Sequence, residues 1–151
     1  MKTILIVSAV VVALLVGGTF LSRSLTSADP SVITTAGIHW HPRLTILVKS
    51  VAVPIPANIG IGPAFAERAS YGDGGMAMTA IHTHEDMPVI HLEFSGVVRT
   101  RDIVLGQFFE IWGRDMRSFG ENMRMTVNGA ENTEYENYQM RDGDTIVLDY
   151  D

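Results

Sequence analysis

Residues 81–94 read IHTHEDMPVIHLEF and contain three of the five histidines of the chain. We interpret the stretch as a β-hairpin, with strands over residues 80–84 and 89–94 joined by a turn at residues 85–88. Successive side chains of a strand alternate between its two faces, so residues two apart share a face. On this pattern three imidazoles and a carboxylate share one surface of the hairpin, namely those of His82, His84, His91 and Glu93.

A second histidine pair lies upstream in GIHWHP, residues 37–42, again with one residue between the two histidines. Both would point to the same side of a strand that contains them. Neutral imidazole is the commonest side-chain metal ligand near neutral pH, and sets of three histidines with or without a carboxylate suit zinc, copper, nickel or iron. The candidate metal ligands are therefore His82, His84, His91, His39, His41 and Glu93.

Three methionines lie close to the hairpin, with Met76 and Met78 just before it and Met87 in its turn. Thioether sulfur is a soft ligand and favours copper, so we expect copper as the metal, with zinc as the alternative. The methionines have a second interpretation, in which they fill gaps in a core or belong to a flexible loop.

The histidines also have an interpretation without a metal, because a single histidine is more often a surface residue or a hydrogen-bonded core group than a ligand. For the pair in residues 37–42 the alternative is a structural role at the start of the first strand. Glu85 and Asp86 are expected to be solvated turn residues outside the site.

Residues 3–21, TILIVSAVVVALLVGGTFL, carry no charge and are almost entirely apolar. A helix of that length rises about 28 Å, close to the roughly 30 Å hydrocarbon core of a bilayer. The run exceeds the ~7–15 apolar residues of a typical signal peptide, so we expect a membrane anchor, and the alternative is cleavage near Thr26-Ser27-Ala28. Both interpretations place the rest of the chain outside the cytoplasm, in the periplasm or at the cell surface.

The expected organisation is an anchor or signal segment at residues 1–22, a linker at 23–36 and an extracytoplasmic metal-binding domain at 37–151. No acidic residue precedes Asp29, so the exported part contains all 17 acidic residues of the chain and is strongly negative. This charge argues against nucleic acid and against an anionic membrane surface as partners. The chain contains no cysteine, which excludes disulfides, thiolate zinc sites and thiol catalysis.

The first part of the domain has the pattern of a β-hairpin, with strands over residues 44–48 and 51–55. Prolines at the end of the second strand mark it as an edge strand. Residues 57–75 are rich in Gly, Ala and Pro and read as a loop, with residues 70–75 as its most flexible part.

A helix is predicted from four apolar residues at helical spacing, Leu105, Phe108, Phe109 and Trp112. Asp102 is suited to cap its start, and Gly113 to end it. Strands are expected over residues 123–127, 139–140 and 145–150. The chain thus has an α+β pattern, in which a small mixed sheet packs on one helix. Its element order is β-grasp-like, with the histidine-bearing hairpin inserted.

Several longer motifs follow one another along residues 38–150, namely HWHPRLTILV, VPIPANIGI, IHTHEDMPVIHLEF, IVLGQFFEIWG and DGDTIVLDY. As a set they resemble a family of small exported or membrane-anchored prokaryotic proteins. The resemblance maps all six candidate ligands onto family motif positions and associates the chain with membrane systems that handle copper. Members of that family often contain cysteine near Met76 or Met78, and its absence here argues against a thiolate ligand.

The favoured function is that of a binding module, which holds one transition-metal ion for storage, sensing or delivery. One alternative is an accessory subunit of a membrane complex or of an extracellular filament, whose histidines would bind a protein partner. Another is a small metal-dependent enzyme with Glu93 as base. Binding is favoured over catalysis because the sequence contains no HExxH, GxSxG or P-loop motif. The spacing of His82, His84 and Glu93 also differs from that of the metal-binding motif of cupins.

Overall fold

The structure is a computed structural model and describes residues 2–25, 29–69, 71–73 and 76–151. The chain divides into two compact units, Met1–Pro30 and Ser31–Asp151. The first contains helix α1 (Lys2–Leu25), of which Lys2–Ser22 is long and apolar enough to cross a membrane. The predicted apolar N-terminal helix is therefore confirmed, whereas the cleavage position expected at residues 26–28 lies outside the described residues.

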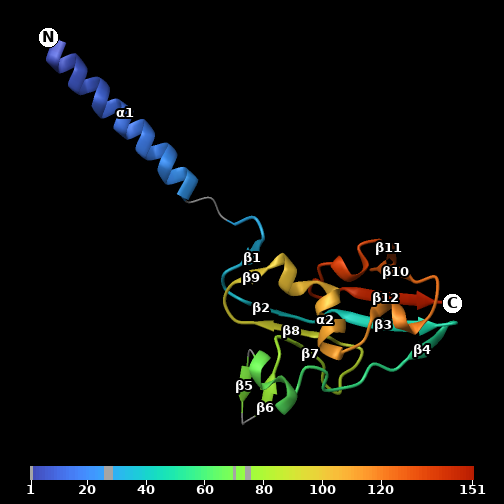
Figure 1. Ribbon diagram of the computed structural model, residues 1–151. Coiled ribbons are helices and arrows are strands. Elements are labelled where there is room, and N and C mark those ends of the chain that lie inside the picture. The colour runs from blue at the N-terminus through green and yellow to red at the C-terminus, as the bar shows by residue number, and fades with distance from the viewer. Residues whose placement is uncertain (1, 26–28, 70, 74–75) are drawn as a thin grey trace. The chain divides into compact units, whose positions relative to one another are not determined.

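The second unit is built on a five-stranded sheet with the order β11-β10-β12-β3-β4 (Figure 1). Its strands are β3 (Arg43–Val48), β4 (Val51–Val53), β10 (Arg124–Val127), β11 (Ala130–Glu131) and β12 (Thr145–Tyr150). The central strands β12 and β3 run parallel, and every other neighbouring pair is antiparallel. The expected hairpin is confirmed as β3–β4, and β4 lies at the edge of the sheet, as its prolines predict.

Two tight turns give this sheet its hairpins. Lys49 and Ser50 have φ values of 50° and 64°, and Asn128 and Gly129 have φ values of 52° and 80°. Two successive positive φ values are those of a type I′ turn, whose twist matches that of the flanking strands.

A second sheet has three antiparallel strands in the order β2-β8-β7, and it contains the histidine motifs. Its strands are β2 (Ile38–Trp40), β7 (Ile81–His82) and β8 (His91–Phe94). Backbone hydrogen bonds join it to the five-stranded sheet, because Ile90 donates to the carbonyl of Pro42 at 2.8 Å and Leu44 donates to that of Pro88 at 2.9 Å. The predicted pairing of the two hairpin segments is confirmed as β7–β8, although β7 ends at His82.

Two further pairs of short strands complete the sheet structure. β1 (Val32–Thr34) pairs with β9 (Val98–Arg99), and β5 (Tyr71–Asp73) pairs with β6 (Met76–Met78). The expected linker thus contains a strand. The segment expected to be a loop contains β5 and a 3-10 helix at Pro63–Arg68, and residues 70, 74 and 75 lie outside the described residues.

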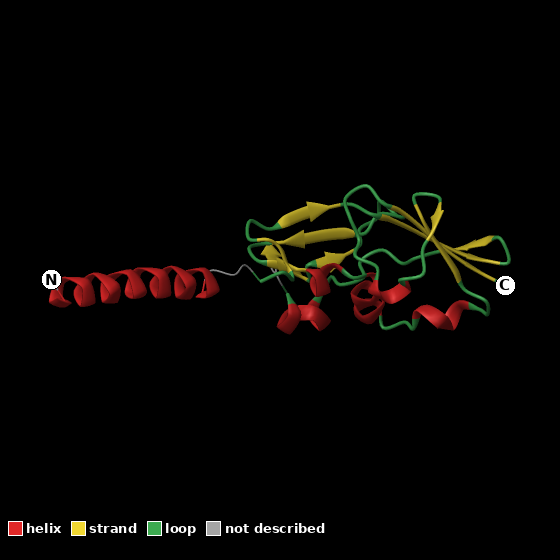
Figure 2. Cartoon of the chain, turned by 90° about the horizontal axis from the view of Figure 1, so that it is seen from above, coloured by secondary structure: helices red, strands yellow, loops and turns green. Residues whose placement is uncertain are grey.

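The predicted helix is confirmed as α2 (Leu105–Trp112), which ends at Gly113 with a φ of 71°. Asp102 does not cap it, because its carboxylate accepts the backbone N–H of Arg99 in the preceding 3-10 turn, Thr100–Ile103. The first N–H of α2, that of Leu105, is instead bound by the carbonyl of Tyr138 at 2.8 Å. Further 3-10 turns lie at Met116–Phe119 and Tyr135–Asn137. Figure 2 shows the helical segments of this unit on one side of the strands.

The hydrophobic core joins both sheets to α2. Ile46 and Leu148 of the five-stranded sheet, Leu92 of β8 and Phe108 of α2 are all fully buried. Residues 139–140 do not form the predicted strand, because Gln139 makes only an isolated bridge with Val104. The α+β class is confirmed, and the β-grasp-like arrangement with an inserted hairpin stays a prediction.

Candidate metal centre

Strand β8 lies between β2 and β7, and the register of both pairings brings polar side chains together. His91 pairs with His82 of β7, and Glu93 pairs with His39 of β2. Side chains of directly opposite residues lie on the same face, with their Cβ atoms about 4.5–5.5 Å apart. One face of the three-stranded sheet therefore presents three imidazoles and one carboxylate, contributed by three separate segments of the chain.

The five imidazole rings form one continuous cluster with His91 at its centre. Centroid distances are 4.7 Å for His39–His41, 5.0 Å for His41–His91, 4.8 Å for His84–His91, 4.8 Å for His82–His84 and 5.4 Å for His82–His91. His84 lies beyond the end of β7, so strand alternation does not position it, yet its ring contacts two others. The structure thus brings all five sequence-predicted histidines together.

Within the cluster two sets of three histidines could each hold a metal ion. One is the inner group, His82, His84 and His91, and the other is the outer group, His39, His41 and His91. In each group one nitrogen atom per ring lies within 4.8 Å of the others. Because His91 belongs to both groups, the two are not independent sites.

His82 is the most buried member of the cluster, with no exposed surface. Its Nδ1 lies 2.9 Å from the carbonyl oxygen of Thr79, and because a carbonyl can only accept, Nδ1 carries the hydrogen. The Nε2 atom then has a free lone pair, and within the described part of the chain it is buried without a hydrogen-bond partner. Burial lowers the pKa of His82 below its usual value of 6.5, so this imidazole is neutral and ready to act as a ligand.

His91 has the opposite arrangement of its two nitrogens. Its Nε2 donates to the carboxylate of Asp86, at 3.1 Å from Oδ2, while its Nδ1 is buried without a hydrogen-bond partner. Desolvation is the largest single influence on the Asp86 carboxyl and raises its pKa, but the hydrogen bond and charge interaction with His91, the local backbone and His84 together outweigh it, so the pKa of Asp86 is lowered. The sequence interpretation left Asp86 outside the site, whereas the structure makes it the group that orients His91.

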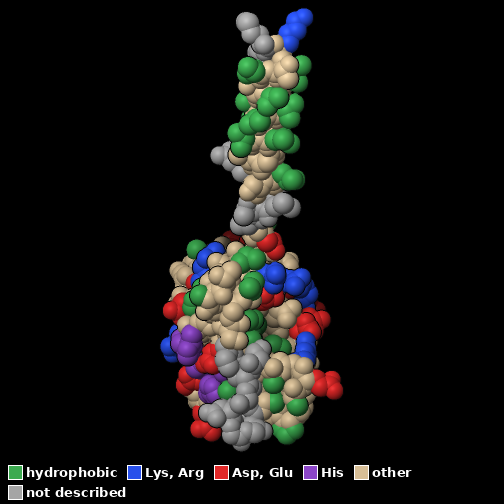
Figure 3. Space-filling view, turned by 90° about the vertical axis from the view of Figure 1, so that its left-hand side faces the viewer, with side chains coloured by type: hydrophobic (Ala, Val, Ile, Leu, Met, Phe, Trp, Pro, Cys, Tyr) green, Lys and Arg blue, Asp and Glu red, His purple; other side chains and the backbone are tan. Residues whose placement is uncertain are grey.

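His39 and His41, the two histidines found only in the outer group, are more exposed than the members of the inner group. The side chain of His39 is 63% exposed and that of His41 is 43% exposed. Nε2 of His39 lies 3.1 Å from Oε1 of Glu93, and the backbone N–H of His41 donates to Oδ1 of Asp142 at 2.8 Å. In the space-filling view, histidine side chains reach the surface beside acidic side chains (Figure 3).

Residues 56–60, which follow β4, hold the backbone around His82 in place through hydrogen bonds. Thr83 donates its hydroxyl to Pro56 and accepts the N–H of Ile59 at 3.0 Å, and the N–H of Thr79 donates to Gly60. Gly60 has a φ of 78°, and a Cβ atom there would lie 3.2 Å from the Cβ of His82. Sequence reasoning missed these supports, because their contacts join segments far apart in the chain.

Two of the three methionines expected to favour copper, Met87 and Met78, have described side chains, and the preference for copper stays a prediction. Met87 is half-buried and packs against the hydrophobic core, as the gap-filling alternative expects. Met78 lies in β6 and forms a bridge with Ile61. The side chain of Met76 lies outside the described part of the structure.

Comparisons of the chain with protein-family models, with curated proteins and with solved structures give no match. The geometry of the cluster itself shows two groups of histidines that could hold a metal ion.

The buried state of His82 predicts a pH dependence of stability in the metal-free protein. Its folded-state pKa is lowered, so below pH 6.5 the unfolded chain takes up a proton that the folded chain does not. The free energy of unfolding should therefore fall as the pH drops below 6.5, and His82→Gln should make that fall shallower. Urea unfolding in the presence of a chelator, followed by tryptophan fluorescence, measures this. If the free energy of unfolding depends on pH equally in the wild type and in His82→Gln, His82 is not neutral and buried in the folded chain.

Proposed function

We propose that this protein binds one transition-metal ion through the inner group, His82, His84 and His91. The observation that carries the proposal is a pair of buried nitrogens, Nε2 of His82 and Nδ1 of His91, that have no hydrogen-bond partner among the residues that the structure describes. Buried polar atoms are almost always paired, and an unpaired one costs about 1–3 kcal/mol. A metal ion between the rings would give both lone pairs a partner.

The opposite nitrogens of the same two rings support this proposal. Ligand histidines usually donate their second N–H to a carboxylate or a backbone carbonyl, which fixes the tautomer and makes the ligand nitrogen more basic. Thr79 supplies the carbonyl for His82, and Asp86 supplies the carboxylate for His91. Each ring therefore already has a tautomer that leaves its second, buried nitrogen free to bind a metal ion.

The spacing of the donors also supports a common ion. Tetrahedral ligands about 2.1 Å from a metal lie roughly 3.4 Å from one another. The donors of the inner group lie within 4.8 Å of one another, a difference that small movements of the rings can close. The Asp86 carboxylate is bound to the other nitrogen of His91, whereas Oε1 of Glu93 lies 3.8 Å from the free Nδ1 and makes Glu93 a candidate fourth ligand.

Among the metals that imidazole binds, copper is the first choice and zinc the second. Cu²⁺ binds nitrogen ligands more tightly than the other divalent metals of its row, and the chain contains no thiolate that would favour another metal.

For the cellular role, we propose a membrane-anchored protein whose metal-binding domain lies outside the cytoplasm and hands its ion to a protein partner. An uncharged apolar helix of membrane-spanning length supports the anchor. The family resemblance, which stays a proposal, supports a place among copper-handling membrane systems. The acidic charge of the exported part would concentrate cations near the domain.

Metal loading tests both parts of the proposal. If the N-terminal helix is an anchor, detergent should extract the chain from membranes at its full mass of 16.5 kDa. After incubation with Cu²⁺ or Zn²⁺ and desalting, elemental analysis should find about one ion per chain. A His82→Ala, His84→Ala double variant should lose most of that metal. Less than about a tenth of an ion per wild-type chain would disprove metal binding.

The two acidic residues of the turn offer a matched pair of variants. Asp86→Ala should weaken metal affinity about 10–100-fold, because His91 loses the group that orients it, whereas Glu85→Ala should leave affinity unchanged. Both residues are exposed neighbours, and only Asp86 contacts the cluster. Competition titration against a chelator measures both affinities. Equal affinities in the two variants would mean that Asp86 has no part in the site.

A further inference from the structure

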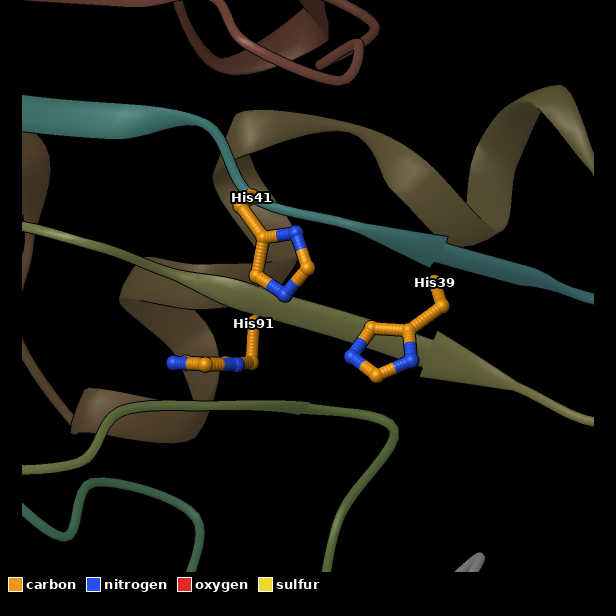
Figure 4. A group of neighbouring side chains, drawn as sticks. All are labelled: His39, His41 and His91. Carbon is orange, nitrogen blue, oxygen red and sulfur yellow. The ribbon is translucent and has the colours of Figure 1, made fainter.

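The outer group is not needed to complete the inner one, yet it is joined to it. His39 and His41 form a set of possible ligands with His91, which is also a member of the inner group. In Figure 4 the rings of His39 and His41 extend from the chain around β2 toward His91 on β8. His41 and His91 meet edge to face, with centroids 5.0 Å apart.

Exposure decreases along the cluster from His39 to His82. The exposed fractions of the side chains are 63% for His39, 43% for His41, 24% for Glu93 and 12% for His91. His82, at the far end, is fully buried, and His84 of the inner group is partly exposed. His39 and His41 are thus the more exposed histidines, and an ion that arrives from their side meets them before it reaches Nε2 of His82.

Glu93 faces both groups through the same oxygen atom. Its Oε1 lies 3.1 Å from Nε2 of His39 and 3.8 Å from Nδ1 of His91. The distance of 3.1 Å between Oε1 and Nε2 of His39 is close to the spacing of roughly 3.4 Å expected between two neighbouring ligands of a tetrahedral ion. This carboxylate can therefore stay on an ion while its histidine ligands change.

We propose that the outer group, His39, His41 and His91, forms an entry site together with Glu93, and that a metal ion passes from it to the inner group while His91 and Glu93 remain its ligands. The proposal rests on metal binding by the inner group. His91 has one free nitrogen, since its Nε2 is bound to Asp86, so the two groups hold an ion one after the other and not together. Each step breaks one bond to an outer histidine and forms one to His82 or His84. The ion thus stays coordinated throughout.

The test compares the rate of metal uptake with the affinity at equilibrium. Zn²⁺ is supplied to the full chain in detergent micelles as its complex with the coloured chelator pyridylazoresorcinol, and stopped-flow absorbance follows its transfer. A His39→Ala, His41→Ala variant should take up Zn²⁺ at least about tenfold more slowly than the wild type. It should lose Zn²⁺ to excess chelator more slowly by the same factor. Its affinity should stay within about threefold of wild type, because the final ligands are intact. Glu85→Ala, an exposed change outside both groups, should alter neither quantity.

Two results would overturn the entry site. Uptake at the wild-type rate would show that ions reach the inner group without His39 and His41. A loss of affinity as large as that of the His82→Ala, His84→Ala variant would make the outer histidines ligands of the resting site. If the wild-type chain takes up no Zn²⁺ and no Cu²⁺ at all, the proposed function itself fails.

Discussion

The position of β8 between β2 and β7 is the constraint on which the metal centre depends. Ile90 and Leu92 are fully buried in the core, so the register of β8 is fixed by hydrophobic burial. A shift of one residue would turn these side chains outward and move His91 and Glu93 into the core. The same burial that stabilises the domain therefore holds the ligand face in place, without any contribution from the metal.

Strand geometry alone does not prepare the ligands, because each imidazole has two nitrogens. The carbonyl of Thr79 and the carboxylate of Asp86 decide which nitrogen of His82 and of His91 remains free. Both acceptors lie just outside the strands, in the segments that lead into β7 and out of it. The centre thus combines a rigid sheet with acceptors from its connecting turns, and this combination leaves two lone pairs unpaired in the interior.

Alternation and turn chemistry predicted much of this arrangement from the sequence. The hairpins, the last strand and α2 follow from local pattern, and so does the shared face of His91 and Glu93. The contact of His39 with Glu93 depends on a pairing between distant strands, which no local pattern reveals. Asp86 was missed because a turn side chain that folds back on its own hairpin has the same sequence signature as a solvated one. Asp102 was misplaced because a tertiary contact with Tyr138 replaces the side-chain cap of α2.

The central claim concerns two particular nitrogen atoms, so nitrogen NMR of isotope-labelled histidines tests it most directly. In the chain loaded with Zn²⁺, His82 should bind the ion through Nε2 and carry its proton on Nδ1. His91 should show the reverse, with the ion on Nδ1 and the proton on Nε2. Resonances of His82 and His91 that do not change on loading, or binding through the opposite nitrogens, would contradict this claim.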